Sequence, residues 1–91
     1  MRLDVRLLEL TFAFVWQSGS FYRAAKLSGF TVMFFIHRMQ VFESWLGEEL
    51  YIKQPKQYRT AVEPTQLGYY FLCCFGNDRI YPRQLVSYRN W

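Results

Sequence analysis

The side chains best suited to chemistry in this chain are cations and hydrogen-bonding groups, and they fall in two short stretches. They are His37, Arg38 and Gln40 in the first stretch, and Lys53, Lys56 and Arg59 in the second. Imidazole, guanidinium and amide groups can hydrogen-bond to the edges of bases, whereas lysine and arginine neutralise phosphates. These residue types therefore indicate contact with a nucleic acid.

The composition is compatible with such a partner but does not require it. Eleven lysines and arginines against seven aspartates and glutamates give the 91-residue chain a net charge of +4, and its pI is about 9.3. A moderate positive charge is also common among small domains that bind no nucleic acid. Apolar residues make up 52% and aromatic residues 21% of the chain. We therefore expect one folded domain with a modest core and some aromatic rings in an interface.

The residues required for other chemistries are missing. Cys73 and Cys74 are the only cysteines, and His37 is the only histidine, which is too few ligands for a zinc site. We expect both thiols to stay reduced on a packed helix, because adjacent cysteines form a disulfide only with strain. The sequence has no nucleophile–base pair, glycine-rich phosphate loop or carboxylate cluster. We therefore predict that the protein is not an enzyme and has no cofactor or metal.

A membrane partner is not expected. The longest apolar run, residues 69–75, is far shorter than a membrane span, and Asp4 and Arg6 interrupt the start where a signal peptide would lie. We therefore expect a cytoplasmic protein.

Three helices are expected in the first half of the chain, at residues 4–18, 20–27 and 32–45. Ser20 and Thr31 can cap the second and third helices with their hydroxyl groups, and a glycine between these helices ends the first of the pair. Two helices joined by so short a turn are typical of a helix-turn-helix, whose second helix enters the DNA major groove. We expect Arg23 and Lys26 on the outer side of the 20–27 helix.

The second half is expected to contain a hairpin, a further helix and a tail. β-branched and aromatic residues at 50–53 and 59–62 flank a proline-containing loop, which is typical of two short strands. A fourth helix should start at Pro64. These elements predict a mainly α fold over residues 1–75, a winged helix-turn-helix with a two-stranded β wing. Residues 76–91 form a basic aromatic tail that we expect to pack on the domain.

Two motifs give the chain a resemblance to a known family. The first holds Gly19, Ser20, Phe21, Arg23, Ala24, Ala25, Glu43, Leu46 and Gly47, and the second holds Val62, Thr65 and Gly68. In this order and at this spacing, they resemble the amino-terminal domain of LysR-type transcriptional regulators over residues 3–72. The resemblance implies a DNA-binding regulator that works as a dimer. The fourth helix breaks at Gly76, so we expect no small-molecule effector domain.

The third helix departs from the family pattern at positions where family members touch DNA. The family's serine-glutamine-proline-alanine is Thr31-Val32-Met33-Phe34 here, and its following serine-arginine pair is Ile36-His37. Most of these positions have become apolar, which removes hydrogen-bonding groups from the face that reads bases. The departure leaves two hypotheses open.

The first hypothesis is a stand-alone transcriptional regulator that binds double-stranded DNA. Its predicted DNA contacts are Arg23, Thr31, His37, Arg38, Gln40, Lys53, Lys56 and Arg59. The alternative is a protein-binding adaptor or inhibitor subunit, whose third helix has become a hydrophobic docking face. That face consists of Val32, Met33, Phe34 and Ile36. A homodimer or a larger protein assembly is compatible with both hypotheses.

Overall fold

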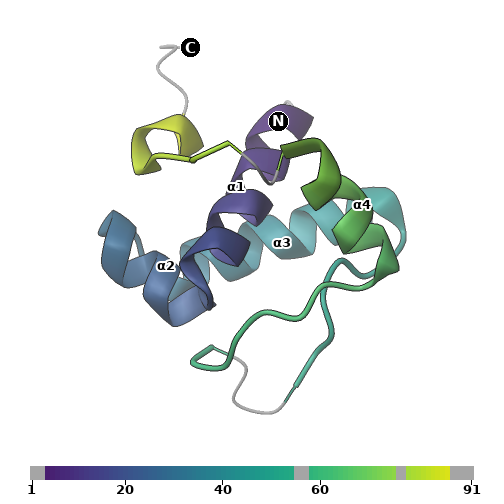
Figure 1. Ribbon diagram of the computed structural model, residues 1–91, viewed down its shortest axis with the longest axis horizontal. Helices are drawn as coiled ribbons and strands as arrows, with labels where there is room; N and C mark the ends of the chain where they lie inside the picture. Colours follow the sequence, from purple (N-terminus) through teal and green to yellow (C-terminus); the bar gives the residue numbers. More distant parts are fainter. Residues whose placement is uncertain (1–3, 55–57, 76–77, 87–91) are drawn as a thin grey trace.

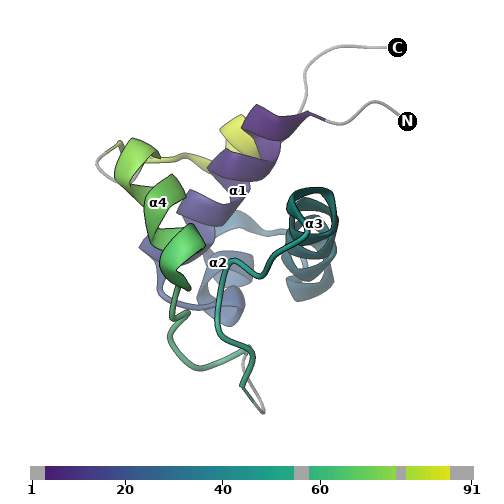
Figure 2. The same ribbon diagram turned by 90° about the vertical axis from the view of Figure 1, so that its right-hand side faces the viewer.

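The computed structural model of the chain describes residues 4–54, 58–75 and 78–86. Its helices are α1 (Val5–Ser18), α2 (Phe21–Ser28), α3 (Val32–Leu46), α4 (Gln66–Phe75) and the 3₁₀ helix η1 (Pro82–Leu85). The first three α-helices lie where the sequence predicts them, and the mainly helical character of the fold is confirmed. The fourth begins at Gln66 and not at the predicted Pro64, which instead forms an isolated bridge with Tyr51. Figure 1 shows α1 in the middle of the bundle, and Figure 2 shows α3 and α4 on opposite sides of it.

The central helix α1 is buried on more than one side. Asp4 caps it by accepting a hydrogen bond from the Leu7 N–H at 3.1 Å. Its buried residues are Leu8, Leu10, Thr11, Phe12, Ala13, Phe14 and Val15. This set is wider than one helix face because α1 contacts α2, α3, α4 and η1. The broad apolar pattern of α1 is therefore accounted for by burial within the chain itself.

Local capping interactions define the turn between α2 and α3. Ser20 Oγ accepts a hydrogen bond from the Arg23 N–H at 3.1 Å. Thr31 Oγ1 accepts one from the Phe34 N–H at 3.0 Å. Gly29 ends α2 at φ 80°, a left-handed conformation that glycine adopts at little cost. These contacts each act within one turn of helix, so the predicted pair of helices forms as expected.

Aromatic rings link three of the helices into one core. Phe14 of α1 stacks on Phe35 of α3, with ring centroids 5.8 Å apart. Phe42 of α3 meets Phe71 of α4 edge to face at 5.3 Å. Truncating a buried phenylalanine to alanine typically costs about 3–5 kcal/mol. These two ring pairs therefore contribute strongly to the attachment of α3 and α4.

The predicted two-stranded β wing is wrong. In the described part of the 50–65 segment there is no β-strand, and the only pairing is an isolated antiparallel bridge between Tyr51 and Pro64. Beside it, the Ile52 N–H donates to the Glu63 carbonyl oxygen at 2.8 Å. The two arms of this segment, residues 50–54 and 58–65, therefore meet at the base of the loop but do not continue as a β-ladder.

The arm that follows residue 57 bonds to a different part of the chain. The Val62 N–H donates to the Gly19 carbonyl oxygen at 2.8 Å. The Tyr58 carbonyl oxygen accepts a hydrogen bond from the Tyr22 N–H at 2.7 Å. Both partners belong to the corner between α1 and α2. A hairpin would need these same groups for pairing, and Pro64 has no N–H to donate.

Helix α4 approaches the base of the loop closely at Gly68. A Cβ atom at this position would lie 2.1 Å from the Leu50 carbonyl oxygen and 3.0 Å from Pro64 Cβ. The same carbonyl oxygen accepts a hydrogen bond from the Thr65 N–H at 3.0 Å. The glycine of the second motif is therefore required by the packing of α4 against backbone.

The described part of the C-terminal tail, residues 78–86, packs on α1. The side-chain amide of Gln17 donates from Nε2 to the Asp78 carbonyl oxygen at 2.5 Å, and its Oε1 accepts from the Ile80 N–H at 3.1 Å. Ile80 and Leu85 are buried. This part of the tail therefore carries apolar side chains that belong to the core as well as cations that are exposed.

Candidate nucleic-acid interface

The exposed side of α3 carries polar and apolar groups but no lysine, arginine, aspartate or glutamate. Met33, His37, Gln40 and Ser44 are exposed and recur every three or four residues, which aligns them along one face of the helix. We call these four residues the α3 stripe. His37 and Gln40 supply groups that can hydrogen-bond to base edges, while Met33 is apolar and 63% exposed.

Two predicted DNA contacts on α3 have roles inside the protein. Thr31 is exposed, but its hydroxyl oxygen caps the helix. Arg38 Nη1 donates to Thr11 Oγ1 at 3.2 Å and to the Leu85 carbonyl oxygen, and its guanidinium lies 4.3 Å from the centre of the Phe34 ring. Burial lowers the pKa of the Arg38 guanidinium below its ordinary value. Arg38 therefore ties α3 to α1 and η1.

Lys53 is held by carboxylates at the base of the loop. Its ammonium lies 2.6 Å from Glu43 Oε2 and 3.8 Å from Glu49 Oε2. It also lies 3.5 Å from the centre of the Tyr51 ring. Burial, with a further contribution from the Glu43 charge, raises the pKa of Tyr51 to about 12. The charge of Lys53 is largely compensated within the protein, and Lys56 lies outside the described residues.

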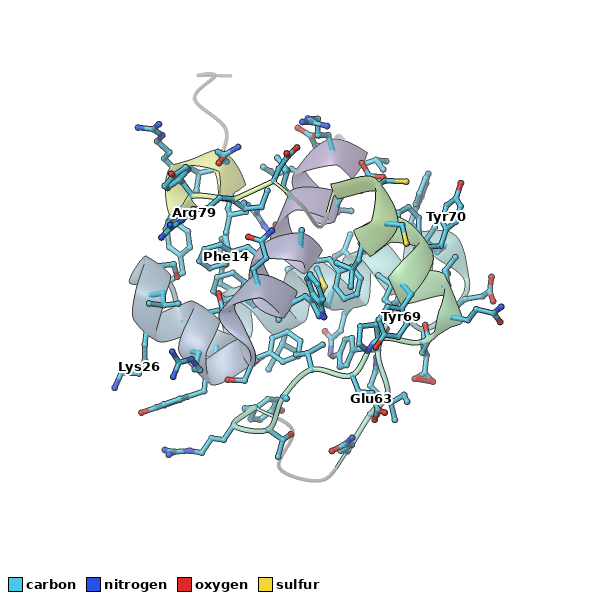
Figure 3. The ribbon with its side chains drawn as sticks, viewed as in Figure 1. Phe14, Lys26, Glu63, Tyr69, Tyr70 and Arg79 are labelled. Carbon is cyan, nitrogen blue, oxygen red and sulfur yellow. The ribbon has the colours of Figure 1, made fainter. Side chains whose placement is uncertain are left out.

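Two other cations lie over the ring of Tyr22 on α2, and a third, Arg23, lies on the same helix. The Arg59 guanidinium lies 4.4 Å from the ring centre, and the Lys26 ammonium lies 5.4 Å from it. Arg23 is exposed one turn before Lys26 on the same helix, and its Nε donates to the Ser18 carbonyl oxygen at 3.1 Å. We call Arg23, Lys26, Arg59 and Tyr22 the Tyr22 cluster. Figure 3 shows Lys26 pointing outward from α2.

The Tyr22 cluster has no carboxylate within ion-pairing distance in the described part of the chain. Two backbone N–H groups in the first turn of α2, those of Tyr22 and Arg23, already bond to Tyr58 and Ser20. Anion binding at this site would therefore depend on the side-chain cations and not on the helix terminus. The arrangement suits an extended phosphate backbone, which neutralises several cations at once.

The four residues of the predicted docking face do not lie together on an exposed surface. Ile36 is buried, Val32 and Phe34 are half-buried, and only Met33 is open to solvent. The ring centroids of Phe34 and Phe30 are 4.5 Å apart. The apolar run at the start of α3 therefore serves mainly to fill the core.

A different uncharged surface lies on α4. This helix contains no charged residue, and Tyr69, Tyr70, Cys73 and Cys74 are exposed. From the sequence, both cysteines are expected as reduced residues on a packed helix. They are free thiols, but both are exposed on the outer side of α4. Figure 3 shows Tyr70 projecting away from the rest of the bundle. Aromatic groups without charges are typical of protein interfaces.

Sequence reasoning missed the organising role of Tyr22. One signal was available, because Lys26 follows Tyr22 by one helical turn and a cation can then reach the ring. The approach of Arg59 was not readable, since it depends on how the 58–62 arm folds back on α2. Within the described ranges, no group of three or more histidine, cysteine, aspartate or glutamate side chains could hold a metal ion.

Comparisons with protein-family models, with curated proteins and with solved structures find no match for this chain. The resemblance to LysR-type regulators therefore stays a prediction that rests on the two sequence motifs. Among the described residues, no helix has both the length and the apolar character needed to cross a membrane.

Proposed function

We propose that this protein binds double-stranded DNA as a transcriptional regulator, with the Tyr22 cluster as its phosphate-contacting surface. The observation that supports this most is the approach of two cations, Lys26 and Arg59, to one ring, with the exposed Arg23 on the same helix and no carboxylate partner for any of the three among the described residues. Like charges held together repel one another, and a phosphate backbone relieves that repulsion. The net charge of +4 acts in the same direction.

The proposal assigns base contacts to the α3 stripe. His37 and Gln40 offer hydrogen-bonding groups, and Met33 can contact a thymine methyl group. Arg38 and Lys53 receive no DNA contact, because their charged groups are engaged within the protein. The proposal retains the cytoplasmic location expected from the sequence.

Binding to random-sequence duplex DNA over a range of salt concentrations tests the phosphate contacts. The logarithm of the binding constant falls with the logarithm of salt concentration by about 0.9 per neutralised phosphate. The three cations of the Tyr22 cluster therefore predict a slope of about −2.7. Arg59→Ala should reduce this slope by about 0.9 and weaken binding to all sequences alike.

Lys53→Ala is the matched control, because it removes the same formal charge from a site where carboxylates already compensate it. We expect a slope close to that of the wild type. An equal loss in Lys53→Ala and Arg59→Ala would show that only net charge matters, which contradicts a defined contact surface. If the protein does not bind DNA at low salt and light scattering shows a dimer or a larger particle, the adaptor hypothesis gains support.

We further propose that two copies pair through α4, which would present two DNA-binding surfaces. Its exposed side lacks charge and carries Tyr69 and Tyr70, the latter 66% exposed. Light scattering should give the mass of a dimer for the wild type and of a monomer for Tyr70→Glu, because the new charge would lose its solvation in the interface. Met33→Glu, on the opposite side of the bundle, should leave the dimer intact. A monomeric wild type at high concentration would refute the pairing.

A further inference from the structure

A cavity of about 370 Å³ lies between α1, the end of α2 and residues 78–80. It shares no residue with the Tyr22 cluster or the α3 stripe. Its volume is at the small end of the range for ligand pockets, about 300–1,000 Å³. Its apolar lining comes mainly from Leu27, which is 61% exposed, because Phe14 and Ile80 are buried and offer little surface to it. Figure 3 shows Phe14 and Arg79 on the side of α1 where the tail crosses above α2.

The polar side of the cavity is held in place by Gln17. Its side-chain amide bonds to the carbonyl oxygen of Asp78 and to the N–H of Ile80, at 2.5 and 3.1 Å. These bonds fix the backbone on both sides of Arg79, and the burial of Ile80 anchors the same segment. The charged groups at the cavity are therefore carried on a positioned segment, which reduces the entropic cost of binding.

Asp78 and Arg79 both line the cavity, and neither forms an ion pair within the described residues. The guanidinium of Arg79 lies 5.7 Å from the centre of the exposed Tyr81 ring, a contact that leaves its hydrogen-bond donors unused. A guanidinium pairs with a carboxylate through two parallel hydrogen bonds, and a carboxylate accepts from an ammonium group. The site thus offers one cation, one anion and an apolar lining.

We propose that this cavity binds a free α-amino acid with a large apolar side chain. The amino acid carboxylate bonds to Arg79 and its ammonium group to Asp78, while its side chain packs mainly against the exposed Leu27, beside the small open surfaces of Phe14 and Ile80. This ligand class matches all three features of the lining, whereas the negative charge of the Asp78 carboxylate would repel a simple anion bound beside it.

Titration of the full chain with L-phenylalanine, followed by nuclear magnetic resonance and calorimetry, tests the proposal. We expect saturable binding that shifts the signals of Phe14 and Ile80. Arg79→Gln and Asp78→Asn should each weaken binding about tenfold or more, the loss expected for one charge-assisted hydrogen bond. Arg83→Gln is the matched control, because Arg83 also lies 5.7 Å from the Tyr81 ring centre but does not line the cavity.

Three smaller compounds separate the contributions of the ligand. 3-Phenylpropionate lacks the ammonium group, 2-phenylethylamine lacks the carboxylate, and glycine lacks the apolar side chain. Each should bind at least tenfold more weakly than L-phenylalanine. Absence of L-phenylalanine binding at millimolar concentrations would overturn the proposal, and so would equal binding of 3-phenylpropionate or an unchanged affinity in Arg79→Gln.

Discussion

Replacing Gly68 with alanine should destabilise this protein, although the same change in an ordinary helix is stabilising. Alanine is favoured over glycine in a helix interior by about 0.8–1.0 kcal/mol. At Gly68, however, an added Cβ would lie 2.1 Å from the carbonyl oxygen of Leu50. This neighbour is backbone, so it cannot move aside as the end of a flexible side chain can.

The expected loss follows from what α4 must do to relieve this contact. Overpacking a well-packed site costs about 1–3 kcal/mol. Displacing α4 also strains the hydrogen bond from the Thr65 N–H to the same carbonyl oxygen, now 3.0 Å long, and such a bond contributes about 0.5–1.5 kcal/mol. After the gain in helix propensity is set against these terms, we expect a net loss of about 1–3 kcal/mol.

Urea and thermal unfolding followed by circular dichroism measure this loss. In a domain of this size, each 1 kcal/mol lowers the Tm by about 4–8 °C. Gly29→Asn is the control, because a Cβ at Gly29 meets nothing within 4 Å and its φ of +80° suits asparagine. That variant should unfold close to the wild type. A Gly68→Ala protein as stable as the wild type, or more so, would refute the close approach of α4 to Leu50.

Two further predictions concern α3 and Tyr51. Ile36→Glu should lower the free energy of unfolding by about 3–5 kcal/mol, because it buries an unpaired charge. Met33→Glu should change the free energy of unfolding by no more than about 0.5 kcal/mol, because Met33 is exposed. Equal unfolding curves for the two variants would contradict the orientation of α3. The pKa of Tyr51 is raised to about 12 from 10.0, so the folded state retains the phenol proton more tightly than the unfolded state. The resulting stabilisation is complete below pH 10 and is lost as the pH rises through about 12. Denaturation of Tyr51→Phe should show a weaker decline over that interval, and identical declines would count against the shift.

The helices could be predicted because their signals act over a few residues. A hydroxyl at Ser20 or Thr31 reaches only the first turn of the helix that follows it, and Gly29 ends α2 through its own backbone conformation. The outward direction of Arg23 and Lys26 follows from the same helical spacing. Half of the Tyr22 cluster was therefore visible in the sequence by itself.

Only the tertiary structure decided which partner a group takes where distant parts of the chain compete for it. The Val62 N–H bonds to Gly19 at the α1–α2 corner and not to the opposite arm of a wing. Arg38 likewise donates to Leu85 of the tail, although its place in the sequence is equally compatible with a DNA contact. Each hydrogen bond contributes only about 1 kcal/mol net, so the choice depends on which partner the packed core brings within reach. Local sequence patterns determined the helices, and packing determined their hydrogen-bond and ion-pair partners.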